Sequence, residues 1–279
     1  MTRPEEPVVE PIQARVVATG LCAAGSHATA ATAHTRLARA SLLAAAFLGW
    51  SVAVGCSTGR ADVNCPNCPC SDYVAKGSPG LVDDLNDGNG YILENDGRRG
   101  GWYTYNDGTG IQTPAGAPPG PPYVCEPETF VPTNGQACTS GSGFTSWGAG
   151  LGVGLLSGAD CVSCKYDATA YSGVRFTISG SVVGSVRFMV VTTATHNVRW
   201  GGTCADDKVC ADSHGTNVTI TTQPQVVEVP WTILRQSGWG TPVLFNVREL
   251  NNFNWEVDRN TTAPVVSFDS LCVDDVSFY

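Results

Sequence analysis

The chain has 279 residues, 12 of them cysteine, and a formal net charge of −9 at pH 7. Residues 1–56 contain four arginines and three glutamates, so the chain from Ser57 onward carries a net charge of −10. This charge argues against nucleic acid or an anionic membrane surface as a binding partner.

An apolar segment near the N-terminus predicts export from the cytoplasm. It covers residues 41–55, follows Arg36 and Arg39, and leads directly to Cys56. It is shorter than the roughly 20 residues that a membrane-spanning helix needs, and no stop-transfer charges follow it. We therefore predict that residues 1–55 are a signal peptide with an over-long start.

The junction after this segment predicts a lipid anchor. Ala53-Val54-Gly55-Cys56 resembles a lipobox, in which a signal peptidase cuts before a cysteine whose sulfur then carries diacylglycerol. Acyl chains on Cys56 would hold the protein at the cell envelope or cell surface, which is the only membrane contact that we expect. The alternative is an ordinary secretory peptide followed by an incidental cysteine.

The remaining chain divides into a tether and a domain. Residues 56–80 contain few apolar side chains and predict a flexible tether that includes Cys65, Cys68 and Cys70. From Leu81, short runs of β-branched and aromatic residues alternate with Gly, Asn, Asp and Pro clusters, a pattern typical of strands joined by turns. Strands are predicted over residues 81–86, 90–94, 101–106, 144–156, 173–179, 184–193, 216–221, 225–230, part of 243–258, and 265–278.

The alternation within these strands predicts the fold class. Residues 174–178 and 186–190 place apolar side chains at every second position, as half-buried antiparallel strands do. The 32 glycines and 17 prolines would interrupt long helices. We predict one all-β domain over residues 81–279, a jelly-roll β-sandwich that is monomeric, in which residues 112–143 form a loop.

Ten cysteines follow Cys56, an even number that predicts disulfides in an oxidising compartment. Cys204 and Cys210 flank five residues and predict a staple at a hairpin tip, and Cys125 and Cys138 could close the 112–143 loop on itself. Pairing of the other six stays open: Cys65, Cys68, Cys70, Cys161, Cys164 and Cys272. Two Cys-x-x-Cys spacings also suit zinc, but export favours disulfides.

Three short motifs stand at the start, middle and end of the predicted domain. They are Val82-Asp83-Asp84-Leu85-Asn86-Asp87-Gly88, Tyr171-Ser172-Gly173-Val174-Arg175-Phe176 and Val273-Asp274-Asp275-Val276-Ser277-Phe278. Together they resemble the family 11 carbohydrate-binding modules, whose fold is a galactose-binding-like jelly roll. The resemblance covers residues 81–279 and implies non-catalytic binding of a polysaccharide or oligosaccharide. Leu85 and Asn86 depart from it, because the family prefers Phe and Glu at these positions.

The resemblance also implies a structural calcium ion near the two ends of the domain. Calcium takes six to eight oxygen ligands, which clustered carboxylates and loop carbonyls supply. The candidate ligands are Asp83, Asp84, Asp87, Asp274 and Asp275. The alternative is that these aspartates hydrogen-bond local backbone in turns.

For a glycan site, the resemblance implies a concave sheet face with exposed aromatic rings. Alternation along the run at 102–107 places Tyr103 and Tyr105 on one face. Further tryptophans and an arginine lie where strands meet loops. The candidate ligand contacts are Tyr103, Tyr105, Trp147, Trp200, Arg199 and Trp255. Each aromatic residue taken singly has core packing as the alternative role.

Two other functions compete with glycan binding. A structural or adhesive envelope lipoprotein could use the same fold to bind a protein, and an aromatic-poor concave face would favour it. A jelly-roll glycoside hydrolase would need two facing carboxyls, and Glu256-Val257-Asp258 only faintly resembles the Glu-x-Asp of laminarinase-type enzymes. No serine or histidine motif of a hydrolase or metal enzyme is present, so we predict a protein that is not an enzyme.

Overall fold

The computed structural model describes residues 73–115, 130–157, 162–183, 185–206, 208–259 and 264–279. The predicted signal peptide, Cys56, most of the tether and Cys125 lie outside these ranges. Among the described residues, no helix has the length and hydrophobicity required to span a membrane.

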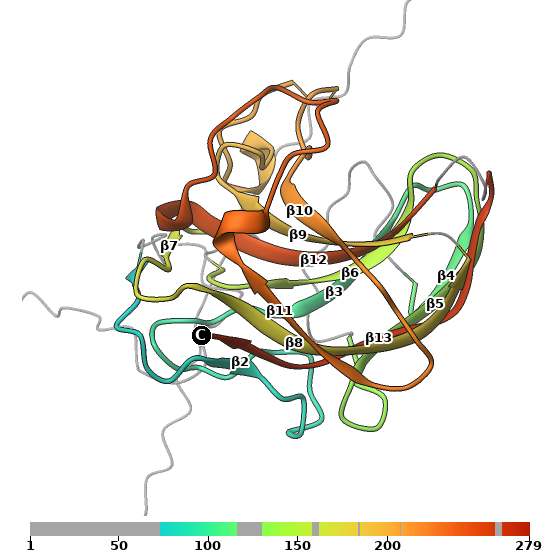
Figure 1. The fold of residues 1–279 in the computed structure, drawn as a ribbon, viewed down its shortest axis with the longest axis horizontal. Coiled ribbons are helices and arrows are strands. Elements are labelled where there is room, and N and C mark those ends of the chain that lie inside the picture. The colour runs from blue at the N-terminus through green and yellow to red at the C-terminus, as the bar shows by residue number, and fades with distance from the viewer. Residues whose placement is uncertain (1–72, 116–129, 158–161, 184, 207, 260–263) are drawn as a thin grey trace, which may run out of the picture. The chain divides into compact units, whose positions relative to one another are not determined.

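The described chain is a two-sheet antiparallel β-sandwich, which confirms the predicted fold class (Figure 1). In the first sheet five strands lie side by side in the order β10-β9-β12-β6-β3, and the short strands β1 and β7 continue from one end of β12. Their bounds are β1 Tyr73–Val74, β3 Trp102–Asn106, β6 Gly148–Gly154, β7 Tyr166–Asp167, β9 Ser185–Thr192, β10 His214–Val218 and β12 Leu250–Asp258.

The second sheet has the strand order β11-β8-β13-β5-β4, with β2 also pairing β13. Its strands are β2 Leu81–Asp83, β4 Ile111–Thr113, β5 Ala137–Phe144, β8 Gly173–Val183, β11 Gln225–Pro230 and β13 Val266–Phe278. Three short 3₁₀ helices lie in connections: η3 Val198–Trp200, η4 Trp231–Ile233 and η5 Val247–Glu249.

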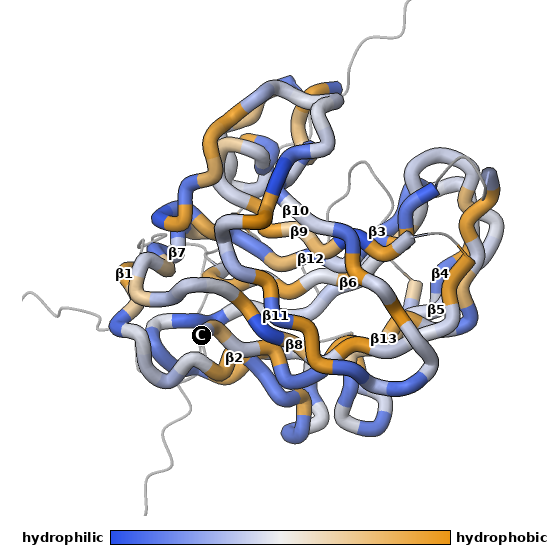
Figure 2. Tube along the Cα trace, in the orientation of Figure 1, coloured by the Kyte–Doolittle hydropathy of each residue, from blue (hydrophilic) through white to orange (hydrophobic). Residues whose placement is uncertain are grey.

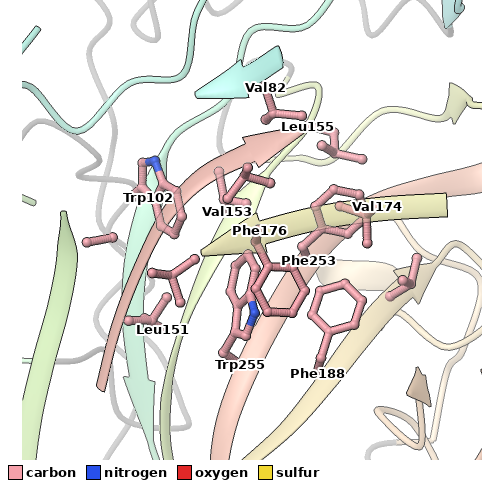
Figure 3. Close-up of a cluster of buried hydrophobic side chains, with 14 of the residues drawn as sticks. Val82, Trp102, Leu151, Val153, Leu155, Val174, Phe176, Phe188, Phe253 and Trp255 are labelled. Carbon is pink, nitrogen blue, oxygen red and sulfur yellow. The ribbon is translucent and has the colours of Figure 1, made fainter. Parts of the chain in front are cut away.

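The core fills the space between the two sheets with aromatic and aliphatic side chains (Figure 3). Trp102 on β3 and Trp255 on β12 stack with ring centroids 5.8 Å apart, and Phe176 from the second sheet meets Trp255 edge-on at 5.1 Å. The Trp102 indole N–H donates to a carboxyl oxygen of Asp83 at 2.6 Å, so this buried polar group is satisfied. Both tryptophans have no exposed surface.

The structure differs from the predicted strands in several places. The segment 112–143, predicted as a loop, contributes most of β4 and all of β5 except Phe144. Residues 90–94 form only an isolated bridge through Tyr91. The end of the predicted tether adds β1 to the first sheet, and Ala75 is buried in the core.

Disulfides connect both neighbouring and distant parts of the chain. The Cys204–Cys210 bond is present as predicted. Cys138, however, bonds to Cys272 and not to Cys125, because β5 and β13 pair with these two cysteines directly opposite each other. Cys164 is also disulfide-bonded. Such bonds are typical of proteins that fold outside the reducing cytoplasm.

Two long connections pack together into a lobe, defined by residues 193–206, 208–213 and 234–249. In Figure 1 the lobe stands beyond the first sheet on the side away from the second sheet, and Figure 2 shows hydrophobic stretches in it. Buried Asp212 holds the second connection, because its carboxylate accepts hydrogen bonds from the backbone N–H groups of Ser237, Gly238 and Gly240 at 2.8–3.0 Å.

Candidate functional site

The outer face of the first sheet carries the side chains that alternation points away from the core. On β3, Tyr103 and Tyr105 face outward while Trp102 is buried. On β12 the outward row is Asn252, Asn254, Glu256 and Asp258. Most of these side chains keep part of their surface exposed, so this face can contact a ligand.

Glycines in β6 allow the two tyrosines to lie across that strand. A Cβ atom at Gly152 would stand 2.5 Å from Cζ of Tyr103, and one at Gly150 would stand 2.8 Å from the Tyr105 hydroxyl. Because β6 has no side chain there, the Tyr103 hydroxyl reaches Oδ1 of Asn254 on β12 and donates a hydrogen bond of 2.6 Å. The glycines therefore bring β3 and β12 side chains into contact over the intervening strand.

Strand register places these side chains in two rows that cross five strands. The first row, from β3 to β10, is Tyr105, Gly150, Glu256, Arg187 and Asn217. The second row is Tyr103, Gly152, Asn254, Met189 and Gly215. Four inter-strand spacings make each row about 19 Å long. The outer face is thus aromatic at its β3 edge and polar across its middle.

Three aromatic rings form the β3 edge of this face. Tyr105 stacks on Trp147 with centroids 5.8 Å apart, and the Tyr103 ring lies 6.1 Å from Tyr105. Asp107 fixes the adjoining turn, because its carboxylate accepts hydrogen bonds from the backbone N–H groups of Ser146 and Gly148 on either side of Trp147. Period-two alternation correctly predicts that the two tyrosines share one face, and the structure brings Trp147 to them.

The electrostatics of the face centre on Glu256. Burial, together with the negative charge of Asp258, raises the pKa of Glu256 to about 8. Burial also raises the pKa of Asp258, while nearby Arg187 and Arg259 oppose that rise. Burial and the adjacent Glu256 raise the pKa of the Tyr105 phenol well above its ordinary value. Burial and the charge of Asp258 therefore favour the protonated form of the Glu256 carboxyl.

The other predicted ligand contacts have different locations. Trp255 has no exposed surface and stacks on Trp102, so it belongs to the core; its neighbours Asn254 and Glu256 take the outward positions. Arg199 and Trp200 lie in η3 of the lobe, and the backbone carbonyl of Trp200 accepts from the Ser163 N–H. The Ser163 hydroxyl in turn donates to Asn252, which connects the lobe to the β12 row.

The five candidate calcium ligands all accept hydrogen bonds from nearby groups in the described structure. Asp83, Asp84 and Asp87 each accept a hydrogen bond from the backbone N–H two residues later, as turn aspartates do. Asp275 accepts a long hydrogen bond from Thr177, and Asp274 accepts one from the N–H of Asp275. No cluster of three or more His, Cys, Asp or Glu side chains suited to a metal ion occurs in the described ranges.

Asn254 is a face residue that the sequence did not single out, and Glu256 was considered only as part of a faint hydrolase motif. Alternation from Tyr103 and Tyr105 carries no information about β12 or β9, because the pairing of these strands is a long-range property. A charged or amide residue between two apolar neighbours, as in 253–257, was the available signal.

No family model and no curated protein matches this sequence. Among solved structures, a family 11 carbohydrate-binding module from Clostridium thermocellum in complex with a β-1,3-1,4-mixed-linked tetrasaccharide is similar, with a TM-score of 0.41 and 14% identity over 71% of this chain and 94% of that chain. The family 11 module of the cellulosomal cellulase Lic26A-Cel5E of Clostridium thermocellum gives a TM-score of 0.38 and 14% identity over 71% and 92%. A CBM4 structure gives a TM-score of 0.32 and 10% identity over 74% and 97%. These likenesses concern the fold alone.

Proposed function

We propose that the outer face of the first sheet binds a glycan without chemical turnover, in an exported protein held at the cell envelope through lipid on Cys56. The observation that carries this proposal is the pair of cross-strand rows, in which aromatic rings at the β3 edge adjoin amide and carboxyl groups on β12. Aromatic rings present flat apolar surface to a sugar ring, and the polar groups can hydrogen-bond its hydroxyls. The aromatic content of the face favours glycan over a protein partner.

The charge of the face narrows the class of glycan. Asp258 lies in the outward row next to Glu256, and the chain from Ser57 has a net charge of −10. Anionic polysaccharides would therefore be repelled. Neutral polysaccharides are the expected ligands.

A binding assay on the purified, oxidised protein tests this function. Neutral and anionic polysaccharides are compared by affinity electrophoresis and glycan array. We expect saturable binding to a neutral polysaccharide that falls at least tenfold in Trp147→Ala and in Tyr105→Ala. Val226→Ala is the matched control, because Val226 is exposed on β11 of the other sheet. Failure to bind any glycan would favour a protein-binding envelope lipoprotein.

One observation supports a glycoside hydrolase as the second candidate. Glu256 and Asp258 share the outward face of β12 two residues apart, and their pKa values are both raised. Glycoside hydrolysis uses a pair of carboxyls as acid and base or nucleophile. Release of reducing ends from a bound polysaccharide that is abolished in Glu256→Gln would establish this candidate and overturn the non-catalytic proposal.

A further inference from the structure

Glu256 occupies the middle of the outer face of the first sheet. It lies on the central strand β12, with Gly150 of β6 on one side and Arg187 of β9 on the other. Because Gly150 has no side chain, the ring of Tyr105 extends from β3 toward the glutamate. A ligand that crosses the strands along the first row must pass Glu256.

The groups around Glu256 compensate a negative charge on it only in part, because Tyr105 and Arg187 favour the carboxylate whereas burial, Asp258 and Asp107 oppose it. Those that face it from the packed elements are Asp258 on β12, Asp107 after β3, Arg187 on β9, and the phenols of Tyr105 and Tyr103 on β3. Arg187 is the nearest cation in the row, but its Nη2 donates to the backbone carbonyl of Arg235 at 2.6 Å. Within the described ranges, Glu256 makes no ion pair within 4 Å. Two neighbouring carboxyls without a direct counterion favour retention of one proton.

We propose that Glu256 is a neutral carboxylic acid in the ligand-free protein and that its O–H donates a hydrogen bond to an oxygen atom of the bound glycan. This inference rests on the proposed glycan-binding function and adds the chemistry of one contact. A carboxylic acid offers a donor that a carboxylate lacks, and every hydroxyl or ring oxygen of a neutral sugar can accept it. The raised pKa of Glu256, about 8, agrees with this protonation state.

The proposal fixes the direction of the pH dependence. Below pH 8 the donor is present, and affinity is constant with respect to this group. Above pH 8 the carboxylate has lost the donor and carries charge beside Asp258, so the dissociation constant rises by up to tenfold for each pH unit. Glu256→Gln keeps a donor that does not titrate, and its affinity should not change over this range.

Two measurements on the full oxidised protein test the proposal. The first is a ¹³C NMR titration of the Glu256 carboxyl without ligand, assigned by its loss in Glu256→Gln, and we expect a midpoint near pH 8. The second is calorimetry with a neutral oligosaccharide between pH 6 and pH 9.5. Asp258→Asn removes the neighbouring charge and should lower both the NMR midpoint and the pH above which glycan affinity falls. Glu228→Gln, on β11 of the other sheet, should leave these two pH values unchanged.

The outcomes separate this inference from the function on which it rests. An NMR midpoint near the ordinary glutamate value of about 4.3 would overturn the inference while leaving glycan binding intact. The same would follow if wild type and Glu256→Gln lost affinity in parallel above pH 8. If no glycan binds at any pH, the proposed function fails, and with it the contact to Glu256.

Discussion

Trp102 and Tyr103 are adjacent in the chain but have opposite roles, because successive side chains of a strand point to opposite faces. Trp102 contributes to the core and donates its indole N–H to Asp83, while Tyr103 lies on the outer face and donates to Asn254. At the scale of single residues, β3 divides its side chains between the core and the outer face. Substitutions at neighbouring positions should therefore affect different measurements.

Tyr103 allows the ring and the hydroxyl to be tested separately. Tyr103→Phe removes the donor to Asn254, and we expect a loss of about 1–2 kcal/mol in the free energy of unfolding with a less than tenfold loss of glycan affinity. Tyr103→Ala also removes the ring and should lose more than tenfold in affinity. Urea denaturation and calorimetry measure the two effects. Equal affinity losses in both variants would show that the ring does not contact the glycan.

We expect the buried carboxyl of Asp83 to make a pH-dependent contribution to the free energy of unfolding. Burial raises its pKa from 3.8 to about 6, although the hydrogen bond from Trp102 opposes the rise. The folded state therefore binds this proton more tightly than the unfolded state, so the contribution of Asp83 to stability is largest below about pH 4 and is lost as the pH rises through 6. We expect up to about 3 kcal/mol for this group, at 1.36 kcal/mol for each pKa unit. In urea denaturation at pH 4 to pH 7.5, Asp83→Asn should lack this decrease; parallel curves for the two proteins would contradict it.

At the scale of single elements, β6 owes its role to the glycines on its outer face. Its inward residues Ala149, Leu151 and Val153 pack in the core, while the outward glycines give space to side chains of β3 and β12. The strand thus serves as a flat base under the tyrosine rings. Glycine weakens a strand in isolation, so its presence here follows from the close approach of its neighbours.

Gly152→Ala tests this role against a matched control on the same strand. The new Cβ would stand 2.3 Å from Oδ1 of Asn254 and 2.5 Å from the Tyr103 ring, so we expect a loss of about 1–3 kcal/mol in stability and at least a tenfold loss of glycan affinity. A Cβ at Gly154 would meet no atom closer than 3.5 Å. Gly154→Ala should therefore change stability and glycan affinity by much less. Similar losses in the two variants, measured by urea denaturation and calorimetry, would refute the role assigned to Gly152.

At the scale of the whole molecule, disulfides and sheet pairing hold distant parts of the chain together. Cys138 and Cys272 are 134 residues apart in sequence and connect β5 to β13, while Cys204 and Cys210 are six apart and close a loop within the lobe. Cross-linking a longer segment restricts the unfolded chain more strongly. The first bond should therefore contribute more to stability than the second.

Paired substitutions measure this difference. In the chain-entropy model, loss of the Cys138–Cys272 bond in a double Cys→Ser variant costs about 5 kcal/mol, and loss of the Cys204–Cys210 bond costs about 2 kcal/mol. Chemical denaturation of the two double variants at pH 7 gives the comparison. A larger loss from the lobe disulfide would contradict the ranking.

Calcium binding remains a prediction from sequence, and the structure provides a clear expectation for its test. Because Asp83, Asp84 and Asp87 hydrogen-bond local backbone, we expect the melting temperature to change by less than about 2 °C between excess calcium and excess chelator. A concentration-dependent increase in melting temperature with calcium, absent with magnesium, would support the predicted calcium site. Differential scanning calorimetry supplies the measurement.

Properties that depend on neighbouring residues could be predicted from the amino-acid sequence. Period-two alternation indicated the all-β class and placed Tyr103 beside Tyr105, and the short spacing of Cys204 and Cys210 indicated their bond. Each of these follows from local geometry, because strand periodicity and short-loop closure involve only a few adjacent residues. β5 was not predicted because its Ser and Gly residues have low strand propensity. Pairing with β13 and β4 stabilises this strand in the folded protein.

Which strands meet, and what covers each buried face, depends on the folded chain. Alternation in 253–257 separates apolar Trp255 from polar Glu256, but it does not show that Trp255 packs against Trp102 and Phe176. The contact between Tyr103 and Asn254 spans 151 residues, and the bond between Cys138 and Cys272 spans 134. Contacts of this kind depend on long-range strand register, which is set by the collective packing of both sheets and not by any local pattern.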